Sequence, residues 1–180
     1  MKVCIISSSP NEIGLTMDCV NSCIEEIKNT RNDYKHFCLN KYNILRCQAC
    51  GDRGWGICLN EHKCVLNDDF NDLYKEISEY DYYIFITPVY FHEMSESAKT
   101  FFDRLKRVDV FNDNSVIKGK KVISIACAGG SGTGTDSTLS SMKILTKFLK
   151  LETTAEIGVN KKNKEDKLTE IKNSVREMMK

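Results

Sequence analysis

KVCIISSSPNEIGLT, residues 2–16, begins as an apolar run and changes into a polar loop within two positions. Lys2–Ile6 is short, apolar and rich in β-branched residues, which is typical of a buried strand. Beyond the loop, apolar side chains recur at helical spacing from Thr16 to about Asn29, with Thr16 or Gly14 placed to start the helix. The stretch therefore predicts the first strand, loop and helix of an α/β fold.

The alternation of strand and helix continues to the end of the chain. We expect further strands at residues 34–39, 82–87, 121–127 and 153–159, and further helices at 68–78, 96–107, 136–150 and 165–179. This order demands a parallel sheet with right-handed crossovers and helices on both faces. The whole chain, residues 1–180, is predicted to form a single doubly wound domain.

Composition and net charge indicate which kinds of binding partner the chain is suited to. The chain has 180 residues and a formal net charge of +1, so it carries no electrostatic signature of nucleic-acid or anionic-membrane binding. We find no signal peptide with a charged n-region and no membrane span. Nine cysteines without a secretory signal predict a cytoplasmic protein, in which clustered thiols indicate metal or redox chemistry more than disulfides.

Three loops that follow strands are unusually polar or glycine-rich: residues 7–15, 88–95 and 127–135. In doubly wound sheets a ligand binds beyond the carboxyl ends of the strands, where the strand order switches. We therefore expect these three loops to surround a ligand.

The first of these loops predicts an anion site. Hydroxyl groups of Ser7, Ser9 and Thr16, together with free N–H groups at the start of a helix, are suited to bind an anion. The loop fits neither the GxGxxG nor the GxxxxGK[ST] pattern, which favours a monophosphate over a pyrophosphate or triphosphate. The alternative is a polar turn whose hydroxyls only cap the helix.

Ser8-Ser9-Pro10 through Thr16 resembles the G-S-P-x(n)-G-N-T loop of the NADPH-dependent FMN reductase and iron–sulfur flavoprotein families. Ser8 stands for the usual Gly, Leu15 for the usual Asn, and Glu12 lies where a basic residue is common. The resemblance implies a flavodoxin-like, five-stranded sheet of strand order 2-1-3-4-5 and a bound FMN. Its phosphate would be held by Ser9, Asn11, Leu15 (through its backbone) and Thr16, and Ser7 is a further expected cofactor-binding residue.

The second loop, Thr87–Ser95, resembles the [ST]-P-x-Y-x-x-x-[MP]-[ST] segment of the same families. We expect Pro88 to end the strand and fix the turn. Val89, Tyr90 and Phe91 can pack against a flat aromatic ring, and Met94 matches the family pattern. The alternative is an aromatic turn that serves only the core.

The third loop offers close approach of backbone to a ligand at Ala128, Gly129, Gly130 and Gly132. In the resembled families, similar loops donate backbone N–H groups to the pyrimidine side of the flavin, and such donors stabilise the reduced ring. The alternative is a flexible surface turn.

A cysteine-rich insert is expected at about residues 40–67, where Cys47-x2-Cys50-x7-Cys58-x5-Cys64 fits neither helical nor strand periodicity. Iron–sulfur flavoproteins carry a similar C-x2-C-x2-C-x(4–7)-C loop that binds a [4Fe–4S] cluster. Arg53 stands here where their third cysteine would fall. Three alternatives stay open for the four cysteines: no metal, an iron–sulfur cluster, or zinc. Trp55 in this insert is expected to pack within the loop or to stack on the flavin of a neighbouring chain.

Together these features predict an FMN-dependent oxidoreductase. Hydride would pass from NAD(P)H to the flavin, and electrons would then pass to a small acceptor such as a quinone, flavin, nitro or azo compound, or metal. No catalytic side chain is expected, because the cofactor carries the chemistry. The resemblance also implies a homodimer or homotetramer. The alternative is an iron–sulfur flavoprotein or a flavodoxin-type electron carrier without NAD(P)H turnover.

Overall fold

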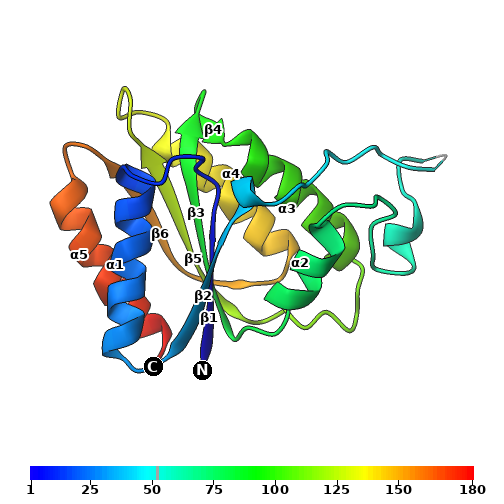
Figure 1. Cartoon of the computed structure of the whole chain (residues 1–180), viewed down its shortest axis with the longest axis horizontal. Helices are drawn as coiled ribbons and strands as arrows, with labels where there is room; N and C mark the ends of the chain where they lie inside the picture. The colour runs from blue at the N-terminus through cyan, green and yellow to red at the C-terminus, as the bar shows by residue number, and fades with distance from the viewer. Residues whose placement is uncertain (52) are drawn as a thin grey trace.

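A parallel sheet forms the centre of the computed structural model, which describes residues 1–51 and 53–180 (Figure 1). Its strands are β1 (Lys2–Ser7), β2 (Asp33–Cys38), β3 (Tyr82–Tyr90), β4 (Glu93–Met94), β5 (Lys121–Ala128) and β6 (Glu152–Asn160). The α-helices are α1 (Leu15–Asn29), α2 (Phe70–Ile77), α3 (Glu96–Asp109), α4 (Thr135–Phe148) and α5 (Lys164–Met178). Two 3₁₀ turns, Leu39–Lys41 and Ile57–Leu59, lie between β2 and α2.

The strand order is β2-β1-β3-β5-β6, and all four of these pairings are parallel. This confirms the predicted order of the five long strands. The sixth strand, β4, was not expected; it is a two-residue strand that pairs antiparallel with the end of β3.

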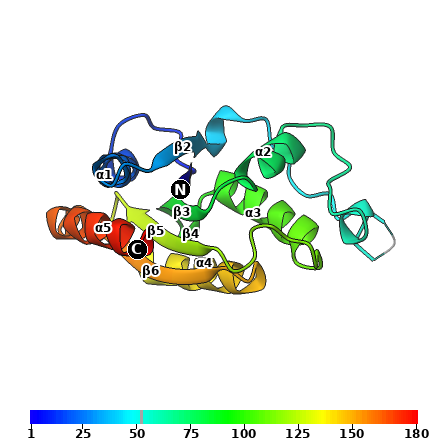
Figure 2. The same ribbon diagram turned by 90° about the horizontal axis from the view of Figure 1, so that it is seen from below.

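Two helical layers cover the sheet, as Figures 1 and 2 both show. Helices α1 and α5 cover one face, where their apolar side chains pack on Val3, Ile5 and Ile84. Helices α2, α3 and α4 cover the other face, where Phe37, Phe85 and their neighbours are buried. Period-two burial on both faces explains why the central strands are continuous apolar runs.

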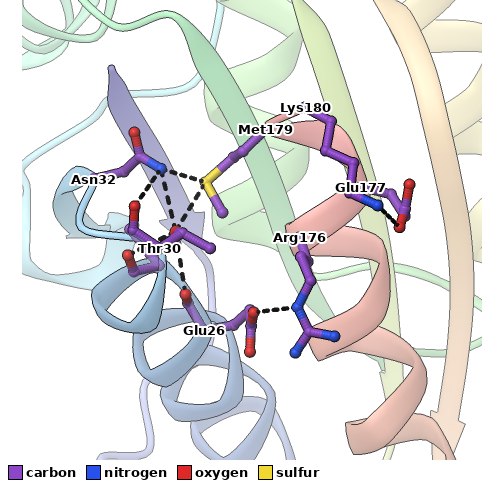
Figure 3. Close-up of polar contacts among 8 residues, drawn as sticks. Glu26, Thr30, Asn32, Arg176, Glu177, Met179 and Lys180 are labelled. Atoms are coloured by element: carbon purple, nitrogen blue, oxygen red, sulfur yellow. Dashed lines mark hydrogen bonds and ion pairs between the residues drawn. The ribbon is translucent and has the colours of Figure 1, made fainter.

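Helices α1 and α5 are joined by polar contacts at their carboxyl ends (Figure 3). The Arg176 Nε donates to Glu26 Oε1 at 2.7 Å, and the Glu26 side chain is only 3% exposed. Thr30 and Asn32 contact the Met179 sulfur nearby. These contacts hold the carboxyl end of the chain against the first helix, at the end of the sheet opposite the loops that follow β1, β3 and β5 (Figure 1).

The prediction that Pro88 ends a strand is wrong, because β3 continues through Pro88 to Tyr90. The Ile86 carbonyl accepts from Ser8 N, so the backbone of Ile86 faces β1, and that of Pro88, two residues on, faces the same side. The β1 strand has already ended at Ser7, opposite Ile86. A proline fits there because its missing N–H removes no ladder hydrogen bond.

A buried ion pair connects α3 to the start of α2. Arg104 Nη2 donates to Asp68 Oδ1 at 2.9 Å, Arg104 Nη1 also bonds Asp68, and the two side chains are 1% and 0% exposed. Burial alone would raise the pKa of Asp68, but the bond from Arg104 and backbone bonds from Leu45 and Phe70 lower it below its ordinary value. A depressed pKa means that this contribution to stability is present above the unfolded pKa of about 4 and is lost as the pH falls through the folded pKa.

No helix among residues 1–51 and 53–180 is long and apolar enough to cross a bilayer.

We expect Asp68→Asn to destabilise the fold, because it leaves the Arg104 charge buried without its partner. The free energy of unfolding in urea at pH 7 should fall by about 3 kcal/mol. Asp103→Asn is the matched control, since Asp103 pairs with Lys99 at 50% exposure, and it should change stability by less than about 0.5 kcal/mol. Equal effects of the two substitutions would contradict this role for the buried pair.

Candidate functional site

The three loops at the carboxyl ends of β1, β3 and β5 meet at one edge of the sheet (Figure 1). They enclose a cavity of about 180 Å³. The cavity is lined by Ser9, Asn11, Ile13, Gly14, Leu15, Thr16, Pro88, Val89, Tyr90, Cys127, Gly129 and Gly130. Three segments that lie 72 and 37 positions apart in the sequence, between Thr16 and Pro88 and between Tyr90 and Cys127, are therefore brought together, as the strand ends predicted.

Gly14 shapes the entry to α1. It adopts φ +117° and precedes the first helical residue, Leu15, and no side chain caps this helix in the described part of the chain. The first amide N–H groups of an α-helix have no partner within the helix. Because Leu15 and Thr16 line the cavity, the start of α1 presents such donors to it, with the positive end of the helix dipole behind them.

Ser8 fixes the same loop from its other side. Ser8 N donates to the Ile86 carbonyl at 3.1 Å, and Ser8 Oγ accepts from Ser95 Oγ at 2.8 Å. Ser97 Oγ also donates to the Ser8 carbonyl, at 3.1 Å. The Ser8 hydroxyl is thus buried in a bond to the start of α3 and is not directed at the cavity, while the next residue, Ser9, lines it.

The residues that line the cavity are all uncharged. Glu12 does not line it; its carboxylate pairs with Lys41 at 3.3 Å and is 82% exposed. The negative charge of Glu12 is therefore paired and solvated outside the cavity. An anion bound here would rely on amide and hydroxyl donors rather than on a cation.

The β3–β4 hairpin forms the second wall. Val89 pairs with Met94 and Tyr90 with Glu93, so Phe91 and His92 are the two turn residues, at φ +49° and +64°. Positive φ at both positions is the geometry of a two-residue hairpin turn that matches strand twist. This turn carries Tyr90 to the cavity and leaves the Phe91 ring fully exposed at the tip.

The glycine-rich loop forms the third wall and rests on the hairpin at Gly134. A Cβ at Gly134, where φ is +88°, would lie 2.9 Å from His92 Cα and 2.9 Å from Val89 Cγ1. By contrast, nothing lies within 4 Å of a Cβ built at Gly129 or Gly130. The loop is therefore tightly packed where it touches the hairpin and open where it borders the cavity.

Nine of the fourteen predicted cofactor-binding residues line the cavity, and five do not. Those outside it are Ser7, Phe91, Met94, Ala128 and Gly132. Met94 and Ala128 are buried, at 8% and 3% exposure. Their roles in binding stay predictions.

Ser7 Oγ lies 2.7 Å from His36 Nε2, a contact that the sequence did not predict because His36 belongs to a different strand, β2. Burial, with a smaller contribution from Lys41, lowers the pKa of His36, so the imidazole is neutral at pH 7. This pairing occupies the Ser7 hydroxyl at the back of the loop.

Ile13, Gly14 and Cys127 line the cavity without having been predicted as binding residues. Ile13 is 86% exposed, and a hydrophobic residue in a polar loop carries no distinguishing sequence signal. The sequence placed Cys127 only at the end of a strand. A cysteine there is typical of the buried core and does not indicate a binding role.

The four cysteines of the insert line one small cavity of about 20 Å³, beside Arg104 and Arg107 of α3. The insert projects outward beyond α3 in both views (Figures 1 and 2); Asp52 lies outside the described residues. Trp55 packs within its own chain, with its ring 5.3 Å from that of Phe111 and 4.8 Å from the Arg107 guanidinium.

The donor set fits an iron–sulfur cluster or zinc, since either takes four thiolates. Arg104 Nε is buried and lacks a hydrogen-bond partner among the described residues, so it could donate to an anionic group in this cavity. No three His, Cys, Asp or Glu side chains of the described residues are grouped closely enough to hold a metal ion. Cys47, Cys50, Cys58 and Cys64 therefore share a cavity without forming a coordination sphere.

Comparison with known proteins is consistent with this geometry. Residues 1–166 match the sequence profile of a family described as NADPH-dependent FMN reductase. An iron–sulfur flavoprotein of Archaeoglobus fulgidus is 28% identical over 132 residues, which are 73% of this chain and 56% of that protein. One of Methanosarcina thermophila is 25% identical over 142 residues, or 79% of this chain and 71% of that protein. This chain thus spans little more than half the length of the first relative.

Solved structures share the fold. An NAD(P)H:quinone oxidoreductase from Methanothermobacter marburgensis aligns with a TM-score of 0.76 at 19% identity, covering 100% of this chain and 96% of that chain. A flavodoxin from the domain Archaea aligns with a TM-score of 0.65 at 12% identity, covering 99% and 96%. The predicted flavodoxin-like fold is thereby confirmed.

Gly134→Ala should destabilise the protein by more than Gly119→Ala. Both glycines have positive φ, but a Cβ at Gly119 would meet nothing within 4 Å, whereas one at Gly134 would overlap His92 and Val89. We expect Gly119→Ala to lower the free energy of unfolding by about 1 kcal/mol and Gly134→Ala by at least about 2 kcal/mol, measured in urea. Indistinguishable losses would mean that the glycine loop does not rest on the hairpin.

Proposed function

The chain belongs to the NADPH-dependent FMN reductase family, and from that premise we propose that it binds FMN between its three loops and works as an NAD(P)H-dependent oxidoreductase. The observation that carries the proposal is the uncharged cavity bounded by the start of α1, the β3–β4 hairpin and the glycine-rich loop. Bound FMN would supply the redox chemistry, accepting hydride from a reduced nicotinamide and passing electrons to a small acceptor.

The start of α1 is the proposed phosphate subsite. Ser9 and Thr16 contribute hydroxyls, Asn11 an amide, and Leu15 a backbone N–H in the first turn of the helix. A monophosphate dianion placed there gains from charge-assisted hydrogen bonds and from the helix dipole. Because Ser8 is bonded to both Ile86 and Ser95, the loop is held in place before the ligand arrives.

The hairpin and the glycine loop are the proposed ring subsite. Val89 and Tyr90 would pack against the isoalloxazine, while Gly129 and Gly130, which have open space beside them, allow backbone N–H groups to approach its polar edge. No lining side chain is a carboxylic acid, a histidine or a lysine. The chain's part is therefore to bind and orient the reactants rather than to transfer protons.

The surface next to the cavity bears on the oligomeric state of the protein. Hydrophobic side chains stand exposed on both sides of the cavity, Ile13 at 86% and Phe91 at full exposure. Exposed apolar groups that flank a binding site favour contact with a further molecule. We infer that a homodimer or homotetramer covers them, and that the protein acts in the cytoplasm.

Thr16→Val should weaken FMN binding selectively, because valine keeps the shape of threonine but cannot donate to the phosphate. The dissociation constant for FMN, measured by quenching of flavin fluorescence, should rise by about tenfold or more. Riboflavin, which lacks the phosphate, should bind the variant and the unchanged protein equally. A variant that loses affinity for both ligands alike would place the phosphate elsewhere.

A second candidate function is electron transfer through an iron–sulfur cluster in the insert. It is favoured by the convergence of Cys47, Cys50, Cys58 and Cys64 on one cavity with the unpartnered Arg104 Nε. The cysteines would hold the cluster through their thiolates, and Arg104 would donate to its sulfur atoms. Closure of the insert around the cluster would have to bring the four sulfurs closer together.

This second function predicts that anaerobic reconstitution with iron and sulfide gives about four iron atoms per chain and a broad brown absorption. Cys58→Ser should lose the iron, whereas Cys38→Ser, a half-buried cysteine outside the insert, should keep it. An FMN-loaded chain that takes up no iron, or takes up zinc alone, would contradict the cluster and leave the reductase proposal intact.

A further inference from the structure

Three buried cysteines lie together beneath the cavity, outside the cysteine-rich insert. Cys19 and Cys23 are one turn apart on α1, and Cys127 lies at the carboxyl end of β5. Their exposures are 0%, 0% and 2%. The Cys127 thiol donates to Cys19 Sγ at 3.7 Å, so the two sulfur atoms are in contact.

The pair of Cys19 and Cys127 lies directly beside the proposed ligand site. Cys127 lines the cavity together with Thr16, and Cys19 is three residues beyond Thr16 on the same helix. The contact between the two sulfurs therefore joins the helix that begins at the phosphate subsite to the strand that leads into the glycine loop. Packing alone would not require two thiols here, since any small apolar side chain fills such a position.

We propose that Cys19 and Cys127 form an oxidative modification site, at which a peroxide closes them into a disulfide and an FMN phosphate in the cavity opposes that closure. The pairing stands on the sulfur contact alone. The opposition by FMN rests on the proposed function.

The reaction balances with hydrogen peroxide as the oxidant. The Cys127 sulfur, which borders the cavity, attacks one peroxide oxygen; the O–O bond breaks, Cys127 becomes a sulfenic acid and one water leaves. The Cys19 sulfur then attacks that sulfenic sulfur, the S–S bond forms and the second water leaves. Two thiols lose two electrons and two protons, and one peroxide is reduced to two waters.

The surroundings of Cys127 should make its reaction with peroxide slow when FMN occupies the cavity. The bond with Cys19 and burial raise the pKa of Cys127, although the Thr16 hydroxyl acts in the opposite direction. Little thiolate is therefore present, and reaction depends on access through the cavity. A ligand phosphate at Thr16 would close that access, whereas the empty cavity leaves it open.

Disulfide formation would also act back on the cavity. The sulfurs must approach from 3.7 Å to about 2.05 Å, which draws Cys19 in the second turn of α1 towards Cys127 near the end of β5. Thr16 and Gly129 lie on either side of that movement and both line the cavity. FMN binding and the disulfide are thermodynamically linked. The factor by which FMN lowers the equilibrium constant for disulfide formation equals the factor by which the disulfide lowers the affinity for FMN.

Peptide mapping of the folded, FMN-free chain tests the pairing. Accessible thiols are first blocked with iodoacetamide, the reagent is removed, and hydrogen peroxide is added. Trypsin should then release a linked pair of peptides, Val3–Lys28 and Val122–Lys143, with fragment masses that locate the bond at Cys19 and Cys127. Dithiothreitol should separate them. Recovery of both thiols in free form, or a bond from Cys127 to Cys23, would overturn the proposal.

Two variants control the experiment. Cys23→Ala removes the third thiol and should leave the linked peptides unchanged. Cys19→Ala removes the resolving thiol and should leave Cys127 as a sulfinic acid without a link. If either variant fails to fold, the unchanged protein still decides the pairing.

The effect of FMN is measured in the same assay. Saturating FMN should slow linkage by about tenfold or more, because it blocks access to Cys127, and the linked protein should bind FMN more weakly than the reduced protein. If FMN binds but leaves the rate unchanged, the coupling is wrong. If FMN does not bind while the link still forms, the proposed function fails and the modification site stands.

Discussion

The register of three neighbouring parallel strands is the constraint on which the site depends. Ser7 of β1 lies opposite Ile86 of β3, and Pro88 of β3 lies opposite Cys127 of β5. Since parallel strands end at the same edge of a sheet, the loops after them must meet there. The bond from Ser8 N to the Ile86 carbonyl closes the arrangement, because it fastens the first loop to β3 one residue beyond the end of β1.

The lining of the cavity that results is uncharged, which restricts how it would recognise the phosphate of the proposed flavin. Without a lysine or arginine in the lining, affinity for the proposed phosphate would come from oriented N–H and hydroxyl donors, whose attraction is short-ranged and depends on geometry. Rigidity would then matter more than charge, which gives a reason for the bonds from Ser95 and the half-buried Ser97 to the buried Ser8. The sulfur contact between Cys19 and Cys127 lies within the same scaffold.

Sequence periodicity predicted the five long strands and the convergence of the loops, because buried parallel strands and strand-end loops have strong local patterns. The order of the strands was predicted from the family resemblance. Periodicity did not predict β4 or the continuation through Pro88, since whether a proline interrupts a strand depends on whether its neighbour, β1, has already ended. The contact of Ser7 with His36 was not predicted, because it joins two strands whose pairing only the folded chain defines. The spacing of the four insert cysteines did indicate a common site, but not that Arg104 and Arg107 would border it.

The central claim is that the loops after β1, β3 and β5 together bind one FMN molecule. The most direct test is an NMR titration of isotope-labelled protein with FMN, following each backbone amide. The account predicts that shifts concentrate at residues 9–16, 89–92 and 128–134, with those of the first group absent when riboflavin replaces FMN. Shifts confined to the insert around Cys47–Cys50, or spread without relation to the three loops, would contradict it.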